Sequence, residues 1–152
     1  MSTKYWIAVV SKDHVNKGVE GGFAQAGHGK SAPLKRMKKD DWLIYYSPTI
    51  KLKTRELAPL KGEENKCQCF TAIGIVKDDR IYQVEMSNDF IPNRRDVDYK
   101  KFKEVSILPL IEKLSFIEDK KHWGYKFRFG ILEIPEKDFK IISGLMLQKN
   151  YD

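Results

Sequence analysis

The sequence predicts an α+β domain in which a curled, mixed β-sheet of about five or six strands closes into a small barrel with short flanking helices. Two strand-like segments are apolar on both faces, which favours a sheet that is covered on both sides. A charged tetrad at residues 77–80 separates two further apolar runs, as in an antiparallel hairpin. Because 152 residues is a common domain size, we expect one domain over residues 1–152.

The first predicted strand covers residues 4–10 and is expected in the middle of the sheet. Both of its alternating sets of side chains are apolar, so both faces should be buried. The sets are Tyr5, Ile7 and Val9 on one side and Trp6, Ala8 and Val10 on the other. A short helix should follow, capped by Ser11 or Asp13 and ended by Gly21 and Gly22.

The segment from residue 23 to residue 47 joins a glycine-spaced polar loop, a basic stretch and an aromatic strand. Two glycines free the backbone around His28, Lys30 and Ser31, so main-chain N–H groups can approach an anion such as a phosphate. A Walker-type phosphate loop would need a glycine where this chain has Ala24. We therefore predict a binding loop and exclude a nucleotide hydrolase of that type.

Residues 33–38 are expected to form one or two helical turns with a basic outer face, and residues 41–47 a strand. Along this strand, alternate side chains face opposite sides of the sheet. Trp42, Ile44 and Tyr46 share one side, and Leu43, Tyr45 and Ser47 share the other. Only one of the two tyrosines can therefore face the glycine loop, and the alternation leaves open which one.

The second half of the chain is predicted from its apolar runs and its prolines. We expect a long exposed loop over residues 48–66, a hairpin from 70–76 and 81–86, an irregular segment at 90–95, a short helix over 105–114 broken near Pro109, a strand over 125–134 and a closing helix over 135–146.

A net charge of +7 and a pI near 9.3 point to a polyanionic partner, most often nucleic acid, ahead of an acidic membrane surface. The apolar run at residues 5–10 is too short for a signal peptide or a membrane span, so we expect a cytoplasmic protein. Cys67 and Cys69 are too close for an unstrained disulfide, and the histidines show no ligand spacing with them. No metal and no cofactor are expected.

Several short motifs, taken in order over the whole chain, resemble one protein family. They are Tyr5-Trp6-Ile7, Gly22-Phe23 with Gln25 and His28-Gly29-Lys30, Pro33-Leu34 with Arg36-Met37, Asp41-Trp42 with Tyr45-Tyr46-Ser47-Pro48, Phe70-Thr71-Ala72-Ile73-Gly74 and Arg94-Arg95. The chain resembles the EVE domain, a member of the superfamily that also contains PUA and YTH domains. The resemblance implies a PUA-like pseudo-barrel with a concave pocket, which in YTH and related domains accepts a modified base flipped out of a nucleic-acid strand.

The resemblance also implies which residues would form the site. The base pocket would contain Ser11, Phe23, Gln25, His28, Tyr46, Ser47 and Pro48, with Phe23 and Tyr46 stacking and Gln25 and Ser47 reading an edge. The phosphates would be contacted by Lys30, Arg36, Arg94 and Arg95. An extruded base needs these three kinds of group. We expect a monomeric reader of a methylated base in RNA or DNA, with no catalytic residue, no membrane contact and a separate effector protein as partner.

Other interpretations of the same residues stay open. The tryptophans are better explained by core packing, His28 equally well by a hydrogen bond across its own loop, and Arg94 and Arg95 equally well by ion pairs. A small hydrolase or nuclease would use His14 or His28, although no triad spacing is visible. The adjacent carboxylates at 40–41 and 78–79 fall at turn-like positions. A third alternative is an adaptor domain that binds a metabolite.

Overall fold

The first strand lies in the interior of the sheet, as its two apolar faces predict. In the computed structural model, which describes residues 3–26, 29–51 and 65–147, β1 (Tyr5–Val9) pairs in parallel with β3 (Trp42–Thr49). On its other side β1 pairs antiparallel with β7 (Ile131–Ile134). The strands predicted over residues 4–10 and 41–47 are therefore confirmed.

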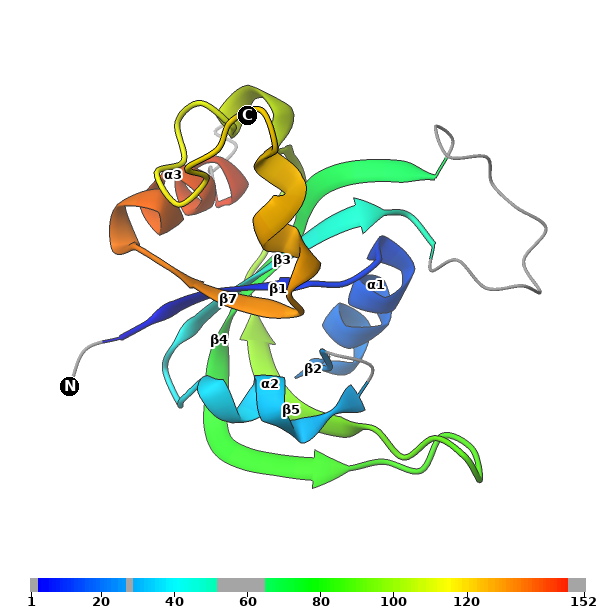
Figure 1. Cartoon of the computed structure of the whole chain (residues 1–152). Helices are drawn as coiled ribbons and strands as arrows, with labels where there is room; N and C mark the ends of the chain where they lie inside the picture. Colours follow the sequence, from blue (N-terminus) through cyan, green and yellow to red (C-terminus); the bar gives the residue numbers. More distant parts are fainter. Residues whose placement is uncertain (1–2, 27–28, 52–64, 148–152) are drawn as a thin grey trace.

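The remaining strands extend the sheet beyond β3. They are β2 (Phe23–Ala24), β4 (Lys66–Gln83), β5 (Asn93–Tyr99) and β6 (Val105–Ser106). The strand order of this seven-stranded sheet is β2-β5-β4-β3-β1-β7, with β6 paired to β4. Apart from β1 and β3, the neighbouring strands are antiparallel. Figure 1 shows the sheet curling around helix α2.

The sheet is open, and the expected barrel of five or six strands is wrong in that respect. Its two edges are β2, of two residues, and β7, of four residues, so little backbone is available to close it. Helix α2 (Ser31–Arg36) contacts the β5 side through Arg95, and Arg36 Nη1 donates to the carbonyl of Ile131 in β7 at 3.2 Å. Helix α2 therefore connects β5, next to one edge, with β7 at the other edge, where a closed barrel would have a ladder of hydrogen bonds.

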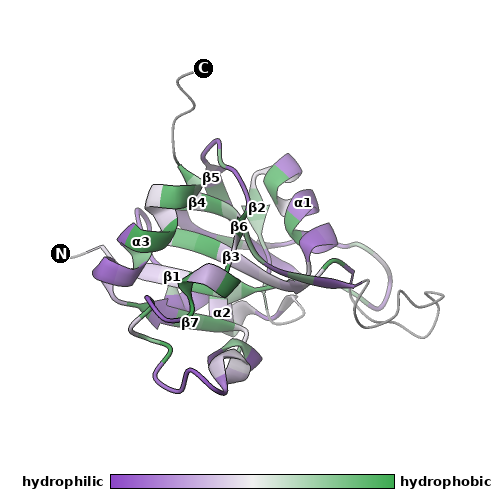
Figure 2. Cartoon of the chain, turned by 90° about the horizontal axis from the view of Figure 1, so that it is seen from above, coloured by the Kyte–Doolittle hydropathy of each residue, from purple (hydrophilic) through white to green (hydrophobic). Residues whose placement is uncertain are grey.

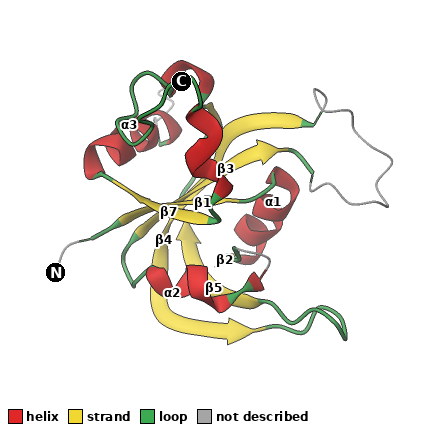
Figure 3. Ribbon diagram, in the orientation of Figure 1, coloured by secondary structure: helices red, strands yellow, loops and turns green. Residues whose placement is uncertain are grey.

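Each face of the sheet has its own hydrophobic core. Helices α1 (Lys12–Gly21) and α2 pack on one face through Val15, Leu34 and Met37. Helix α3 (Glu136–Met146) packs on the other through Phe139 and Ile142. Figure 3 shows the helices on both sides of the strands, and Figure 2 shows the apolar residues gathered between them. The sheet is thus covered on both sides, as the apolar strands predicted.

The predicted hairpin over residues 70–76 and 81–86 is wrong, because β4 continues through the charged tetrad as one strand of eighteen residues. Its register with β5 shifts between Val76 and Ile81, so the tetrad forms an irregularity within the strand. The polar groups there have partners on neighbouring segments: Asp79 accepts a hydrogen bond from the Lys39 backbone N–H, and the Asp78 carbonyl accepts from Arg95. The actual hairpin joins β4 to β5, and Ser87 bridges to Phe90 near its tip.

The other elements agree with the predictions in part. The helices after Ser11, around Leu34 and after Pro135 are confirmed, with α1 ending at Gly22 in a left-handed conformation (φ 74°). Strand β5 begins at Asn93 and so includes the second half of the irregular segment expected at 90–95. A 3₁₀ helix, Trp123–Arg128, replaces the first part of the strand predicted over 125–134. Strand β6 and a 3₁₀ helix, Leu108–Leu110, replace the helix predicted over 105–114. Most of the loop expected over 48–66 lies outside the described residues.

Within the described ranges, each helix is too short or too polar to cross a lipid bilayer.

Candidate functional site

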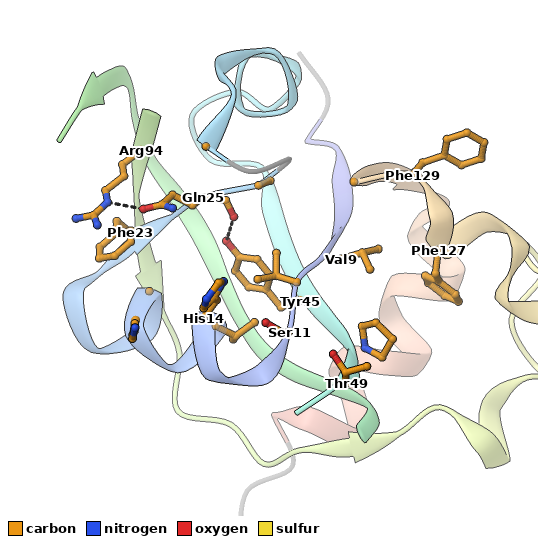
Figure 4. A pocket seen from close by; sticks show the side chains of 18 of the residues that line it. Val9, Ser11, His14, Phe23, Gln25, Tyr45, Thr49, Arg94, Phe127 and Phe129 are labelled. Carbon is orange, nitrogen blue, oxygen red and sulfur yellow. Dashed lines mark hydrogen bonds between the residues drawn. The ribbon is translucent and has the colours of Figure 1, made fainter. Parts of the chain in front are cut away.

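A cavity of about 600 Å³ opens where β1 and β3 end and α1 begins. Its walls come from five places: the end of β1, the first turns of α1, the segment around β2, the end of β3 and residues 127–130. Met86, Phe90 and Arg94, from the β4–β5 hairpin and β5, complete the rim. Figure 4 shows Val9, Ser11, His14, Tyr45 and Thr49 around one space, with Phe23, Gln25 and Arg94 at one end of it. The cavity is therefore assembled from segments that are far apart in the sequence.

The turn from α1 into β2 places Phe23 at the wall. Gly22 ends the helix at φ 74°, a conformation that glycine adopts without strain. At Gly21 an added Cβ would come within 2.4 Å of the Phe23 ring, so a side chain at that position would displace the ring. Tyr99 fixes the same turn by donating its hydroxyl to the Phe23 carbonyl at 2.8 Å.

Arg94 covers one face of the Phe23 ring. Its guanidinium carbon lies 3.8 Å from the ring centroid, which is a close cation–π contact. The same side chain donates from Nε to Gln25 Oε1 at 2.6 Å. Since its oxygen is engaged, Gln25 has its amide N–H groups left to donate to a ligand. Figure 4 shows the three side chains together at one end of the cavity.

Tyr45 forms part of the floor and is almost fully buried, with 2% of its surface exposed. Its hydroxyl donates to the Gln25 backbone carbonyl at 3.3 Å, which ties β3 to the segment after β2. Burial raises the pKa of Tyr45 to about 12, and burial also raises the pKa of the neighbouring Tyr99 well above its ordinary value. The floor is therefore neutral at physiological pH and holds residues 23–25 in place.

Ser11 supplies a directed acceptor at the junction of β1 and α1. Its hydroxyl donates to the Asp13 carboxylate at 2.6 Å, and this uses its only proton. The lone pairs of Ser11 Oγ stay available to a ligand that donates an N–H. Ser11 and Gln25 thus offer an acceptor and a donor from two sides of one cavity.

The described lining residues carry positive charge and include no carboxylate. The basic groups are His14, Lys17, Arg94 and Arg128. His14 and Lys17 are exposed on α1, and Arg128 is exposed at the end of the 3₁₀ helix. The cavity is therefore apolar and aromatic inside, with the cations Lys17, Arg94 and Arg128 and the His14 imidazole at its edge. This arrangement suits a flat polar ring linked to anionic groups.

Five of the eleven predicted site residues line this cavity. They are Ser11, Phe23, Gln25, Pro48 and Arg94. Strand ends and the α1–β2 turn bring them together from positions more than eighty residues apart. His28 lies outside the described residues.

Tyr46 and Ser47 occupy the core instead of the pocket, which corrects the expectation for both. Tyr46 is 2% exposed and packs against Phe70 and Phe127, with ring centroids 5.6 Å and 4.3 Å away. Ser47 is fully buried and shares a 2.7 Å hydrogen bond with Thr71. For Tyr46 the physical reason is strand alternation, because Tyr45 faces the α1 side of the sheet and Tyr46 therefore faces the α3 side. For Ser47 alternation alone would give the side of Tyr45, but the register of β3 with β4 shifts around it and its hydroxyl is taken up by Thr71 of β4.

The predicted phosphate contacts are also placed differently. Arg95 is 2% exposed, and its guanidinium donates to the carbonyls of Leu34, Met37 and Asp78, so it serves the fold. Arg36 lies 5.1 Å above the Trp6 ring and bonds to β7. Lys30 is exposed at the start of α2 and is not among the lining residues.

Sequence reasoning missed part of the wall, namely Tyr45, Phe127, Arg128 and Phe129. A signal was present for three of them, because Lys126-Phe127-Arg128-Phe129 alternates basic and aromatic residues. The same alternation also predicts a strand over 125–134, in which it would describe the two sheet faces. Lys17 was missed because a helical lysine next to a cavity looks like any solvated lysine.

Among the described residues, no nucleophile is paired with a histidine in the way that the enzyme alternatives require, and His28 lies outside them. His14 lines the cavity near Ser11, but the Ser11 hydroxyl donates to Asp13. Asp41 is buried and accepts hydrogen bonds from Trp6 Nε1 and from the Lys4 and Lys38 backbone N–H groups. No group of three metal-ligating side chains occurs among the described residues, and Cys67 and Cys69 are free thiols. Burial raises the pKa of Cys67 to about 11.

Comparison with known proteins gives one consistent family. The model of the family described as "EVE domain" matches residues 4–145. A UPF0310 protein of Bacillus licheniformis is 51% identical over 138 residues, covering 91% of this chain and 88% of that protein. The UPF0310 protein YdcG of Bacillus subtilis is 47% identical over 146 residues, covering 96% and 94%. The NMR structure of Rpa0253 from Rhodopseudomonas palustris has a similar fold, with a TM-score of 0.53, 15% identity and coverage of 98% and 97%.

Proposed function

The chain belongs to the EVE domain family, and from this premise we propose that it is a nucleic-acid binding module that reads a modified, methylated base of RNA or DNA in the cavity beside Phe23. The observation that carries the proposal is the composition of that cavity. Aromatic and apolar walls, a donor and an acceptor, and four basic groups meet in one space of about 600 Å³. Pockets for small organic groups commonly measure about 300–1,000 Å³.

The proposed mode of recognition follows from the fixed groups. A base flipped out of its strand would enter along Phe23 and Phe127, above the Tyr45 floor, and exclude water from these rings. Ser11 Oγ would accept a hydrogen bond from the base, and the Gln25 amide would donate one. A methyl group added to the base would be buried against Val9 and Val10, which also line the cavity.

The stacking partners differ from the expected pair of Phe23 and Tyr46. Arg94 already covers one face of Phe23, so this ring offers the base its other face or its edge. Phe127 takes the position that Tyr46 was expected to hold, because Tyr46 packs behind Phe127 in the core. The pocket is therefore proposed as a partial aromatic cage with an arginine in its wall.

The basic groups at the rim would contact the phosphates on either side of the base. His14 and Lys17 stand on α1, and Arg128 stands on the opposite wall. Such contacts hold the strand without reading its sequence, and they make binding weaker as salt rises. Sequence or modification preference must then come from the cavity itself.

Fluorescence anisotropy with labelled strands tests this function. Short strands, plain or carrying N6-methyladenine or 5-methylcytosine, are titrated at two salt concentrations against the wild type and Phe23→Ala. We expect the wild type to prefer a methylated strand and Phe23→Ala to bind it roughly 5- to 150-fold more weakly, the effect of removing one stacking ring. Phe102→Ala is the matched control, because Phe102 is half-buried against both cores and lies outside the cavity lining.

Equal binding of plain and methylated strands by the wild type would contradict the reader function. If Phe102→Ala loses as much affinity as Phe23→Ala, the loss reflects stability alone. Binding of a small metabolite in place of any strand would favour the adaptor alternative.

The proposal also covers the partner protein, the oligomeric state and the location in the cell. A reader without chemistry of its own acts through another protein, so we propose a separate effector as partner, a monomeric state and a cytoplasmic location. Two free thiols in half-buried positions fit a reducing compartment. Affinity purification of the tagged protein tests the effector: one recurring partner is expected, and repeated purifications without one would count against it.

A further inference from the structure

Two exposed aromatic rings stand next to the cavity, on the 3₁₀ helix and the residue that follows it. Tyr125 and Phe129 are each 56% exposed, and their ring centroids lie 6.1 Å apart at an interplanar angle of 83°. The Arg128 guanidinium lies over the Tyr125 ring at 5.1 Å. These three residues are called the aromatic platform below. Exposing two large rings side by side costs hydrophobic free energy unless something covers them.

The platform is held rigidly from beneath. Between its members, Phe127 is 8% exposed and lies between the cavity and the core, where it contacts Tyr46 and Phe116 at ring-centroid distances of 4.3 Å and 5.9 Å. Trp123 packs edge-on against Phe127 at 6.4 Å, and the Tyr125 backbone N–H donates to the His122 carbonyl. The exposed rings therefore belong to an anchored helix, which keeps them in place for a ligand.

The platform is continuous with the cavity. Arg128 and Phe129 line it, whereas Tyr125 does not. Figure 4 shows Phe127 beside the cavity and Phe129, two residues further on, directed away from it. Arg128 and Phe129 therefore border both the cavity and the platform, which is where a chain with one base in the cavity can reach the platform.

The charges around the platform fit a polyanion. The two nearby carboxylates are paired: Glu118 with Lys126 at 3.6 Å, and Asp119 with His122 at 2.9 Å. Among the described residues, no carboxylate lies within ion-pair distance of Arg128. The exposed apolar side chains at the tip of the β4–β5 hairpin are a less suitable surface for a polyanion, because the acidic residues Glu85 and Asp89 lie among them.

We propose that the aromatic platform is a second base-stacking site, for the nucleotide next to the one in the cavity, and that the partner is therefore a single strand. This proposal rests on the proposed function. In a duplex, the neighbours of a flipped base stay stacked and paired and offer no free face. In a single strand, a neighbouring base can unstack and lie on Tyr125 or Phe129 while Arg128 contacts its phosphate.

The test separates the platform from the cavity by ligand length. The wild type, Tyr125→Ala and Tyr125→Phe are titrated with a methylated nucleoside monophosphate, with a short single strand carrying the same base, and with the duplex of that strand. Leu108→Ala is the matched control, because Leu108 is 55% exposed on another 3₁₀ helix away from the cavity. Tyr125 is the residue to change because it belongs to the platform and not to the cavity wall.

We expect Tyr125→Ala to bind the single strand about 5- to 150-fold more weakly and the monophosphate as well as the wild type does. Tyr125→Phe and Leu108→Ala should match the wild type, and the duplex should bind less tightly than the single strand. Unchanged strand binding by Tyr125→Ala would overturn the platform, and so would an equal loss for the monophosphate. Duplex binding as tight as strand binding would overturn the single-strand partner.

The two proposals fail in distinguishable ways. If the wild type binds plain and methylated strands alike, but Tyr125→Ala binds both more weakly, the aromatic platform is supported and the modified-base reader is contradicted. If the wild type prefers the methylated strand and Tyr125→Ala has the same affinity for it, the modified-base reader is supported and the aromatic platform is contradicted. If no nucleic acid binds, both fall.

Discussion

At the scale of single residues, Ser11 and Ser47 show how strand position separates a binding group from a structural one. Both serines are buried and both donate or share a short hydrogen bond. Ser47 points into the core against Thr71, and its position excludes a ligand. Ser11 stands at the end of β1, where the strand opens onto the cavity. The chemistry of the two residues is the same, and only their surroundings differ.

We expect Ser11→Ala to weaken binding of a methylated strand while Ser47→Ala leaves binding nearly unchanged. Losing the Ser11 acceptor removes one hydrogen bond to the base, about 0.5–1.5 kcal/mol or roughly 2- to 12-fold in affinity. Losing the Ser47 hydroxyl leaves Thr71 without its partner, so it should lower the free energy of unfolding by about 1–3 kcal/mol. Anisotropy titration and urea denaturation of both variants measure the two effects. The opposite pattern would place the ligand at Ser47 instead of Ser11.

Arg94 and Arg95 are neighbours in β5 with opposite tasks. Successive side chains in a strand point to opposite sides: Arg94 lies half-buried over the Phe23 ring at the cavity rim, whereas Arg95 is buried and reaches α2. The paired arginines looked like one basic motif in the sequence. The strand divides them into one candidate ligand contact and one structural residue.

At the scale of elements, helix α2 depends on Arg95. This buried guanidinium donates to the carbonyls of Leu34 and Met37 at 2.9 Å and 2.7 Å, at the C-terminal end of the helix. It also donates to the Asp78 carbonyl at 2.7 Å. A six-residue helix has little stability of its own, so this connection to β4 and β5 fixes its position.

We expect Arg95→Ala to lower the free energy of unfolding by about 2–4 kcal/mol, because several buried carbonyls lose their donor at once. Arg36→Ala is the comparison: Arg36 is an exposed arginine of the same helix, and its loss should change stability by less than about 1 kcal/mol. Urea denaturation followed by circular dichroism measures both variants. Equal stability of Arg95→Ala and the wild type would show that α2 is held by its apolar contacts alone.

Strands and helices whose own residues show the expected periodicity could be predicted from the sequence. Those that depend on hydrogen bonds to segments far along the chain could not. Residues 4–10 and 135–146 carry their periodicity within themselves, and the strand and helix there are confirmed. The tetrad at 77–80 looks like a turn locally, but hydrogen bonds from Lys39 and Arg95 keep it within β4. Whether a charged run turns or continues depends on partners that lie elsewhere in the chain. The same reason explains why Asn93–Tyr99 was not recognised as a strand.

At the scale of the whole molecule, basic groups from separate elements surround one cavity. The net charge of +7 predicted a polyanionic partner but not where it would bind. The fold brings Lys17 on α1 and Arg128 near β7 to the same opening. Each charge that contacts a phosphate releases counterions and steepens the dependence of binding on salt.

We expect Lys17→Ala to reduce the slope of log binding constant against log salt concentration by about 0.7, the value for one phosphate contact on a single strand. Lys140→Ala is the matched control, because Lys140 lies on α3 and pairs with Glu136 at 3.3 Å. Titrations over a range of salt concentrations give both slopes. A Lys17→Ala slope equal to that of the wild type would remove α1 from the path of the strand.

The candidate site was predictable where one motif carries it and unpredictable where the fold assembles it. Phe23 and Gln25 follow a glycine-ended helix, which is a local feature. The choice between Tyr45 and Tyr46 depends on which sheet face holds α1, and that is a property of the complete sheet. Phe127 and Arg128 reach the cavity only because β7 returns the end of the chain to β1.

The central place of β1 has a consequence for how the chain acquires its shape during synthesis. β1 needs β7 as a neighbour, and residues 10–130 must be translated before β7 exists. At about 5–20 residues per second, this interval lasts roughly 6–24 s. Meanwhile Trp6 and Ile7 belong to an unpaired apolar edge, the kind of surface that joins other nascent chains. During translation β1 can therefore pair with β3 long before its other neighbour, β7, is available, and its second edge stays open to other chains until residues 131–134 emerge.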